Sequence, residues 1–228
     1  CCVQVVGVGG GGGNAVNRMV QTGISGVEFW SLNTDAQALS RNYAPGKLAI
    51  GQSVTRGLGA GGVPSVGRKA AEESMDDLSK RLVVEGADMV FVTCGMGGGT
   101  GSGAAPLVAE AARDQDSLTV GVVTKPFAFE GRKRMSQANE AIELLREKVD
   151  TLIVIANDKL LQIVPDSTPV QDAFLVADDI LRQGVVGISE IIIKPGLVNV
   201  DFADVRQASR PNAGTALMGL GKATGKTR

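Results

Sequence analysis

A run of nine residues in the middle of the chain has the composition of a phosphate-binding loop. Residues 95–103 read Gly-Met-Gly-Gly-Gly-Thr-Gly-Ser-Gly and join an apolar run at 89–94, which predicts a buried strand, to a helix-favouring stretch at 104–113. Pro106 would lie in the first turn of that helix, where proline is tolerated. Without side chains, main-chain N–H groups can converge on an anion, and the helix dipole adds positive charge. A flexible linker is rarely set between a strand and a helix, so we favour phosphate binding.

A second glycine run lies near the start of the chain. Residues 3–8 predict a strand, residues 9–13 are all glycine, and Asn14 is placed to cap a helix that runs to about Gln21 and stops at Gly23. Alone, this unit would equally fit a dinucleotide fingerprint, but two such loops favour a polyphosphate ligand. Neither loop contains lysine, so neither is a Walker loop. Main-chain amides, helix ends and a metal ion would have to balance the phosphate charge.

Two acidic residues stand where they could contact a nucleotide. Asp35 follows a predicted strand at 27–32, and it either caps the next helix or binds Mg²⁺ directly or through water. Asp178 lies one helical turn after Phe174 in a long predicted helix. An aspartate can accept hydrogen bonds from the N1–H and N2–H groups that guanine has and adenine lacks. Core packing is the default role for Phe174, and a base contact is the alternative.

The predicted elements place the polar candidates at one edge of a sheet. Strands at 118–124 and 151–156 continue an alternation of strands with helices, and several strands are apolar on both faces. This pattern favours an α/β fold in which a Rossmann-like parallel sheet carries helices on both faces. Ligands of such sheets bind at the carboxyl ends of the strands, which the glycine loops, Asp35, Glu130 and Asn157 all follow. One crevice is expected to hold them.

Three longer helices complete the predicted fold. One spans residues 65–84 and is expected to lie over the sheet, and another runs from about Arg134 to Val149. The longest opens at a capping box that begins with Thr168 and closes at Pro195. Its apolar stripe predicts a core helix and consists of Val170, Ala173, Phe174, Ala177, Leu181, Gly184, Ile188 and Ile191.

Composition excludes several kinds of chemistry. The 228 residues include no histidine, which excludes histidine bases, Ser-His-Asp and Cys-His nucleophiles, and histidine metal sites. A formal net charge of -1 gives no electrostatic reason to expect nucleic acid or an anionic membrane as partner, and no apolar run is long enough to cross a bilayer. Three cysteines form neither a disulfide framework nor a zinc spacing, which indicates a reducing compartment. The chain does not start at Met, so a targeting segment cannot be judged from it.

Six motifs resemble, in the same order along the chain, those of FtsZ, the tubulin-like cell-division GTPase family of bacteria and plastids. They are residues 9–14, 33–39, 95–103, 129–134, 157–161 and 199–204. The glycine-rich third motif and the Asn-Val-Asp-Phe-Ala-Asp of the last are the most specific, and the resemblance covers essentially the whole chain. It implies GTP or GDP as the ligand, Mg²⁺ as its ion, and a head-to-tail filament of the division ring as the assembly.

The resemblance also implies a role for each site residue. The phosphates would be held by Gly10, Gly11, Gly12, Gly97, Gly98, Gly99, Thr100 and Gly101. The guanine would be surrounded by Asn14, Asn157, Phe174 and Asp178, with Glu130 and Arg134 near the ribose and phosphates. Asn33 and Asp35 would lie near the terminal phosphate and its Mg²⁺.

The motif at residues 199–204 has a local interpretation and an implied one. Locally it is a turn in which Asp201 caps a short final helix. The resemblance implies instead that the loop docks on the nucleotide of the next subunit, where Asn199, Asp201 and Asp204 are catalytic. At about 1.5 Å per residue, the long helix keeps these acids several tens of ångströms from the base of their own subunit. Hydrolysis is then expected to require a filament, with turnover that rises with protein concentration.

The predicted domain boundaries follow from the same resemblance. Residues 1–206 form a GTP-binding domain that includes the core helix at 169–194 and the catalytic loop at 196–204. Residues 207–228 are a stub of a missing second domain, expected to be disordered or paired with another molecule. Because that domain supplies part of the subunit contact, nucleotide binding is expected to survive while polymerisation and turnover are weak.

Partners and location are further expectations from the resemblance. The partners would be other copies of the chain and membrane-tethering division proteins, which bind a tail absent from this sequence. Nucleic acid and direct membrane insertion are not expected. The location would be the cytoplasm of a bacterium or the plastid stroma, and the runs at 149–155 and 177–184 are more similar to plastid members. Ala156 departs from the family, which usually has proline before this Asn-Asp pair.

Two other functions remain open from the sequence. A nicotinamide-dependent dehydrogenase could use residues 9–14, although it would need neither the second glycine loop nor the motif at 199–204, and Asp35 is an ambiguous ribose ligand. A structural subunit that binds GTP without hydrolysing it is the closer competitor. Replacing Asp201 with alanine separates the two, because a GTPase should lose turnover and keep GTP binding.

Overall fold

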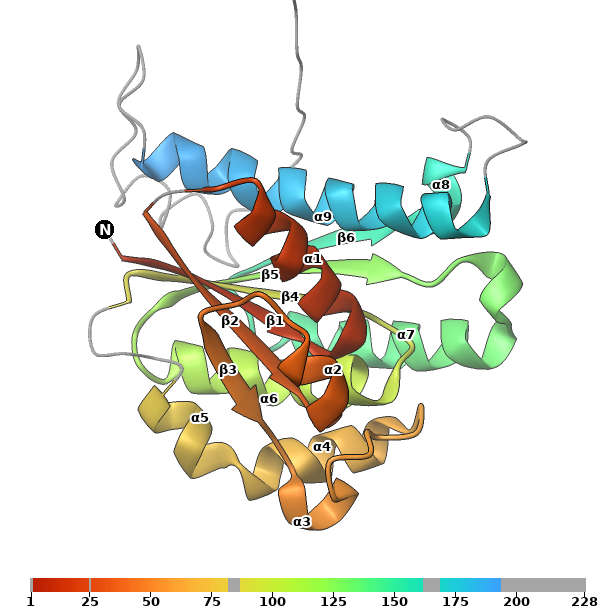
Figure 1. Ribbon diagram of the computed structural model, residues 1–228, viewed down its shortest axis with the longest axis horizontal. Coiled ribbons are helices and arrows are strands. Elements are labelled where there is room, and N and C mark those ends of the chain that lie inside the picture. Colours follow the sequence, from red (N-terminus) through yellow and green to blue (C-terminus); the bar gives the residue numbers. More distant parts are fainter. Residues whose placement is uncertain (1, 25, 82–86, 162–168, 194–228) are drawn as a thin grey trace, which may run out of the picture.

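The fold is a parallel sheet with helices on both faces (Figure 1). The structure is a computed structural model that describes residues 2–24, 26–81, 87–161 and 169–193. In these ranges six strands pair in the order β3-β2-β1-β4-β5-β6, and every pair is parallel. The strands are β1 (Val3–Val8), β2 (Val27–Asn33), β3 (Gly46–Ala49), β4 (Met89–Gly95), β5 (Leu118–Lys125) and β6 (Thr151–Ala156). The predicted Rossmann-like sheet is confirmed.

Helices connect the strands and follow the last of them. In chain order they are α1 (Gly9–Gln21), α2 (Ala36–Ser40), α3 (Gln52–Thr55), α4 (Pro64–Glu73), α5 (Met75–Arg81), α6 (Gly99–Arg113), the 3-10 turn η1 (Ala128–Glu130), α7 (Arg132–Arg146), α8 (Asn157–Leu160) and α9 (Val170–Ile193). The strand order reverses between β1 and β4, and α1 and α6, which follow these strands, lie on opposite faces. Parallel sheets bind ligands at such a switch point.

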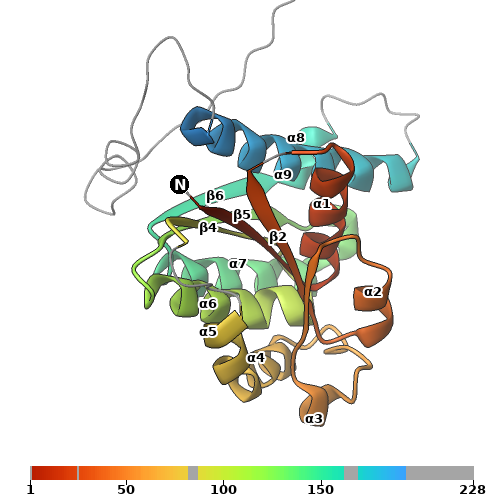
Figure 2. The same cartoon turned by 60° about the vertical axis from the view of Figure 1, so that its left-hand side comes forward.

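Alternation of side chains along the strands creates two apolar layers. In β1, Val3 and Val5 join one core cluster, whereas Val6 and Val8 join the other. α1 and α9 cover the first face, and α6 and α7 cover the second, as Figures 1 and 2 both show. Because both faces are buried, the strands are nearly continuous apolar runs in the sequence.

The first glycine run is helical, which the sequence did not predict. α1 begins at Gly9, so Asn14 lies inside the helix, and Val8 occupies the N-cap position. Packing explains the glycines: a Cβ on Gly12 would lie 2.3 Å from the carbonyl oxygen of Thr93 in β4. Contact with the sheet therefore stabilises a helix that the intrinsic propensity of glycine disfavours.

The second glycine run is also partly helical. α6 begins at Gly99, so Pro106 lies in the helix interior and not in the first turn, where it was expected. A Cβ on Gly101 would lie 2.7 Å from the carbonyl oxygen of Gly95, the last residue of β4. α6 can start this close to its strand only because Gly101 has no side chain.

The helix predicted for residues 65–84 is two helices, α4 and α5. They meet at Ser74, whose hydroxyl accepts a hydrogen bond of 2.9 Å from the N–H of Gly51. The prediction that this segment covers the sheet is wrong, because α4 packs mainly on the outer side of α6 (Figure 1). The approach is close: a Cβ on Gly103 would lie 2.1 Å from the carbonyl oxygen of Pro64.

Three predicted elements differ in burial or length. β6 lies at the edge of the sheet, and its residues are half-buried instead of buried. α7 ends at Arg146, before the predicted Val149. The buried row of α9 consists of Ala173, Ala177, Leu181, Val185 and Ser189. Val170 and Phe174, which the sequence placed in the core stripe, are 56% and 39% exposed.

Candidate functional site

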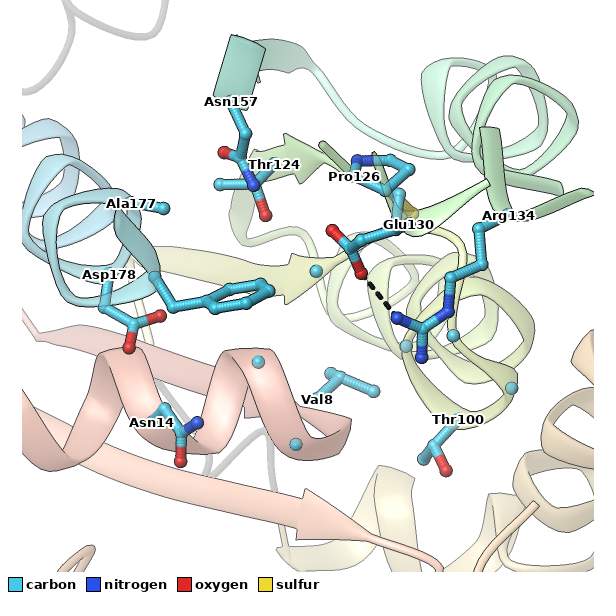
Figure 3. A pocket seen from close by; sticks show the side chains of 18 residues that line it. Val8, Asn14, Thr100, Thr124, Pro126, Glu130, Arg134, Asn157, Ala177 and Asp178 are labelled. Atoms are coloured by element: carbon cyan, nitrogen blue, oxygen red, sulfur yellow. Dashed lines mark hydrogen bonds and ion pairs between the residues drawn. The ribbon is translucent and has the colours of Figure 1, made fainter. Parts of the chain in front are cut away.

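A cavity of about 430 Å³ opens where β1, β4, β5 and β6 end. Its volume is typical of sites that bind small ligands. It lies at the switch point of the sheet, with α1, α6 and the start of α9 around it (Figure 3). Its lining consists of Val8, Gly10, Gly11, Asn14, Gly95, Met96, Gly98, Gly99, Thr100, Gly101, Thr124, Pro126, Glu130, Arg134, Asn157, Phe174, Ala177 and Asp178.

One wall of the cavity is the start of α1. Gly10, Gly11 and Asn14 line it, and no side chain caps the helix. A Cβ on Gly10 would meet no atom within 4 Å, so the missing side chain leaves room for a ligand. Gly12 is buried against β4 and does not line the cavity. The first turn of α1 therefore presents N–H groups and the positive end of a helix dipole.

A second wall is the start of α6, where residues 98–101 line the cavity. No side chain caps this helix either. Gly97 does not line the cavity, and its N–H donates to the hydroxyl of Ser102 over 2.8 Å. Gly97 has a φ of 92°, and a Cβ there would lie 2.8 Å from the carbonyl oxygen of Arg134. Glycine is therefore needed at this position because the turn passes close to the main chain of Arg134.

The polar residues at the start of α7 face the same end of the cavity. Arg134 forms an ion pair with Glu130, whose carboxylate also accepts the N–H of Phe127 over 2.9 Å. Figure 3 shows the guanidinium of Arg134 on the side of the cavity where Thr100 lies. A guanidinium carries five N–H donors and stays charged at neutral pH. This end of the cavity therefore combines two helix N-termini with one cation.

The opposite end of the cavity is lined by amides and a carboxylate. Asn14, Asn157 and Asp178 come from three different elements and lie away from Arg134 (Figure 3). Asn157 is 5% exposed, and within the described residues its Oδ1 has no hydrogen-bond partner. Buried polar atoms in proteins nearly always have a partner. A bound ligand with an N–H or O–H group would supply one.

Asp178 combines burial with an ion pair. Burial raises its pKa from 3.8 to about 6, and the guanidinium of Arg18 opposes that rise. The closest contact of the pair joins Arg18 Nε and Asp178 Oδ2 at 3.6 Å. Its carboxylate is therefore mostly ionised at neutral pH, ready to accept hydrogen bonds from a ligand.

Phe174 belongs to an aromatic cluster at the cavity. The rings of Phe127 and Phe129 stack with centroids 5.0 Å apart, and Phe174 meets Phe127 edge-on at 5.2 Å. Phe174 also lines the cavity and is partly exposed. This position favours the base-contact interpretation of Phe174 over core packing, because an aromatic face at a cavity wall can stack on a heterocycle.

Asn33 and Asp35 are not part of the cavity lining. Asp35 caps α2, because its Oδ1 accepts the N–H groups of Gln37 and Ala38 over 2.9 and 3.0 Å. The described residues contain no group of three or more side chains suited to hold a metal ion. A metal contact of Asp35 stays a prediction.

Some predicted and some unpredicted residues remain to be placed. Asn199, Asp201 and Asp204 lie outside the described residues, as do Thr168 of the predicted capping box and the stub at 207–228. Sequence reasoning missed several residues at or beside the cavity, namely Arg18, Thr34, Thr124 and Pro126. The one signal for Thr124 and Pro126 is their place at the carboxyl end of a strand, and Arg18 lies one helical turn after Asn14.

The two ends of the cavity suit different chemical groups. Helix N-termini and Arg134 favour an anion such as phosphate. Asn157 and Asp178 offer hydrogen bonds to a polar ring, and Phe174 offers an aromatic surface. A single elongated ligand with phosphates at one end and a heterocycle at the other fits both.

Comparison with known proteins assigns the chain to a family. A model of the Tubulin/FtsZ family, GTPase domain, matches residues 2–165. The chain belongs to the tubulin/FtsZ family. An FtsZ structure from M. jannaschii, an empty dimer, is similar to it at a TM-score of 0.87 and 49% sequence identity, over 92% of this chain and 60% of that one. The resemblance to FtsZ expected from the sequence motifs is confirmed.

A less similar protein shares the fold. CetZ2 from Haloferax volcanii, solved as a GTPγS-bound protofilament, has a TM-score of 0.78 and 24% identity over 92% of this chain and 63% of that one. The chain spans about 60% of the length of the M. jannaschii FtsZ. In the part of the chain that the structure describes, every helix is too short or too polar to cross a membrane.

Proposed function

We propose that the chain binds GTP in the cavity and that, assembled with a neighbouring copy, it hydrolyses GTP to GDP and phosphate. One observation carries the proposal: a single cavity has two uncapped glycine-rich helix starts at one end and the side chains of Asn157 and Asp178 at the other. The helix starts supply N–H donors for phosphate oxygens. The two side chains supply acceptors and a donor for a purine.

The choice of guanine follows from Asp178. An ionised carboxylate only accepts hydrogen bonds, and guanine offers N1–H and N2–H on one edge. Adenine presents a lone pair on N1, which an ionised carboxylate repels. The amide of Asn157 can donate to O6 or N7 of guanine, and Asn14 lies across the cavity from it (Figure 3). Phe174 is placed to contact the ring.

The phosphates would be held without a lysine. The main-chain N–H groups at Gly10, Gly11 and residues 98–101 would bind the oxygens, and Arg134 would add a full positive charge near the ribose and phosphates. Gly12 and Gly97 would support these loops from outside the lining.

A magnesium ion would complete the charge balance. Mg²⁺ usually keeps several waters and takes one or two carboxylates besides phosphate oxygens. A contact through water fits Asp35, which lies outside the lining, with Asn33 beside it. The ion would supply positive charge to the terminal phosphate.

Hydrolysis would use polar side chains from the next subunit, two of them acidic. The resemblance to FtsZ motifs assigns this role to Asn199, Asp201 and Asp204, in a loop at 196–204. The assembly is supported by the relatives, because the M. jannaschii FtsZ was solved as a dimer and CetZ2 as a protofilament. Residues 1–206 would be the GTP-binding domain and 207–228 the beginning of a second one, which would contribute to the contact between subunits.

The complete protein would act in cell division. As an FtsZ, it would form division-ring filaments and bind membrane-tethering proteins through a tail. It would work in the bacterial cytoplasm or in the plastid stroma. These roles are proposed from the family alone.

Two alternatives are weaker. A nicotinamide-dependent dehydrogenase needs an acidic ribose ligand after β2, and Asp35 at that place caps α2 instead of lining the cavity. A subunit that binds GTP without turnover has the same cavity, and only kinetics separates it from a GTPase.

Equilibrium titration with GTP, ATP and NAD in the presence of Mg²⁺ tests the binding proposal. We expect GTP to bind at least about tenfold more tightly than ATP, since a wrong base leaves buried polar groups unpaired. Asp178→Asn is expected to reduce this preference while the affinity of the phosphate end is kept. Equal affinity for GTP and ATP, or a preference for NAD, would contradict the proposal.

A further inference from the structure

Thr34 lies behind the cavity wall and does not line it. It follows β2 directly and is 2% exposed. Its Oγ1 is 2.6 Å from Oγ1 of Thr100, which does line the cavity in the first turn of α6. The two residues are 66 positions apart in the sequence, so this hydrogen bond joins the end of β2 to the start of α6.

The main chain of Thr34 is held in place from another side. Its carbonyl oxygen accepts the N–H of Gly59 over 3.2 Å, and the hydroxyl of Thr55 lies 3.3 Å from it but is closer, at 2.9 Å, to the carbonyl oxygen of Gly51. Neither group belongs to the cavity lining. The main chain of Thr34 is thus held from outside the cavity, and its hydroxyl contacts the side chain of Thr100.

The number of protons available on the two hydroxyls fixes the direction of the hydrogen bond between Thr34 and Thr100 when a phosphate is bound. A hydroxyl has one proton to donate and two lone pairs to accept with. Phosphate oxygens only accept, so Thr100 must donate its single proton to the phosphate. Its own oxygen can then accept the proton of Thr34. The chain of donors runs from Thr34 to Thr100 to phosphate, and successive hydrogen bonds of this kind strengthen one another.

We propose that Thr34 is a positioning residue for phosphate binding, which orients the Thr100 hydroxyl towards the nucleotide and fixes it as a donor. The inference rests on the proposed binding of GTP in this cavity. It assigns a role in ligand binding to a buried residue outside the cavity lining, where burial alone would suggest only a structural role.

A double-mutant cycle tests the proposal. Thr34→Val keeps the shape of the side chain and removes the hydroxyl, and Thr100→Val does the same at the cavity wall. We expect Thr34→Val to weaken GTP binding about threefold to tenfold, the range for one net hydrogen bond. In the Thr100→Val background the same substitution should have no further effect on GTP affinity. Thr34→Ser, which keeps the hydroxyl, should bind GTP like the wild type.

Guanosine lacks phosphates, so its affinity distinguishes the two roles. If Thr34 only stabilised the structure, Thr34→Val would also weaken guanosine binding. Its affinity should be the same for the wild type and Thr34→Val. The matched control is Thr119→Val, because Thr119 is equally buried but its hydroxyl donates to the carbonyl of Ser117 at the other end of β5. Circular dichroism confirms that each variant is folded, and Thr34→Ala replaces Thr34→Val in the cycle if the latter does not fold.

Two results would overturn the inference. One is independent, additive losses of GTP affinity from the two valine substitutions. The other is an equal loss for guanosine and GTP in Thr34→Val. Failure of the wild type to bind GTP at all would instead sink the proposed function, so the two failures are distinguishable.

Discussion

Burial of the Asp178 carboxylate lowers the stability of the folded chain but favours the proposed contact with guanine. Its pKa in the folded chain is raised from 3.8 to about 6 because the carboxyl is buried. The folded state therefore holds the proton more tightly than the unfolded state does. The stability that this group contributes is fully present below pH 3.8 and is lost as the pH rises to about 6. At neutral pH the ionised side chain lowers the stability of the folded chain, and the proposed role of this carboxylate is to bind the ligand.

We therefore predict that Asp178→Asn stabilises the nucleotide-free chain at pH 7.5. The free energy of unfolding should rise by roughly 1–3 kcal/mol, since the substitution removes a buried charge, although the ion pair with Arg18 is lost with it. Urea denaturation measures the change. A decrease in the free energy of unfolding would show that the contact with Arg18 outweighs the cost of burying the carboxylate.

The same pKa predicts a pH-dependent affinity for GTP. Guanine needs the ionised carboxylate, so affinity should fall as the pH drops below about 6, by at most about tenfold per pH unit. The terminal phosphate of the nucleotide also titrates near this range. The quantity to measure is therefore the ratio of affinities of the wild type and Asp178→Asn between pH 5 and pH 7.5. A ratio that does not change with pH would exclude Asp178 as the guanine contact.

Asp35 has an observed structural role and a proposed metal role, which two substitutions separate. Asparagine caps a helix as well as aspartate does, whereas alanine does not, so Asp35→Ala should lower the free energy of unfolding by about 1 kcal/mol and Asp35→Asn by much less. If the carboxylate also acts on Mg²⁺, both variants should show a smaller gain in GTP affinity on addition of Mg²⁺. If Mg²⁺ raised the GTP affinity of Asp35→Asn as much as that of the wild type, the metal role would be excluded and Asp35 would only cap α2.

Among helices and strands, the sequence predicts the strands well and the helix starts poorly. Strands buried on both faces are apolar runs, so 89–94 and 118–124 were located to within one residue. The starts of α1 and α6 were misplaced because glycine disfavours helices locally, and only contact with the sheet stabilises them there. Propensity contains no information about such distant contacts.

The candidate site divides in the same way. At the base end of the cavity, motifs indicate Asn14 and Asn157, and the helical spacing after Phe174 indicates Asp178. Thr34 lies within the motif at 33–39, which assigns it no role, and Arg18 lies in no motif. Their contacts, Thr34 with Thr100 and Arg18 with Asp178, depend on elements that meet only in the folded chain.

The glycines of α1 are predicted to differ in the cost of adding a methyl group. Gly12→Ala places a Cβ 2.3 Å from the Thr93 carbonyl oxygen and should lower the free energy of unfolding by about 2–4 kcal/mol. Gly10→Ala meets no atom within 4 Å, so its stability should be unchanged or slightly higher, while GTP binding should weaken because the methyl enters the cavity. Urea denaturation and GTP titration of the two variants check this. Equal costs would contradict the packing of α1 described above.

For the molecule as a whole, the cavity is better equipped to bind GTP than to hydrolyse it. Within the described residues, the carboxylates of the lining are those of Glu130 and Asp178, and each is paired with an arginine. Neither is free to orient an attacking water at the phosphate end. In the proposed function, acids from a neighbouring copy would do so.

Mixing two inactive variants tests whether the site is shared between subunits. Asp201→Ala keeps the nucleotide cavity and lacks a proposed acid, whereas Asp178→Ala keeps the acid and lacks the guanine contact. If each catalytic unit joins the cavity of one copy to the acids of another, a mixture should recover GTP turnover that neither variant has alone, up to about a quarter of the wild-type rate if the copies associate at random. Wild-type turnover per subunit should also rise with protein concentration while GTP affinity stays constant. Turnover that is independent of concentration, together with no recovery in the mixture, would place all of the catalytic groups within one chain.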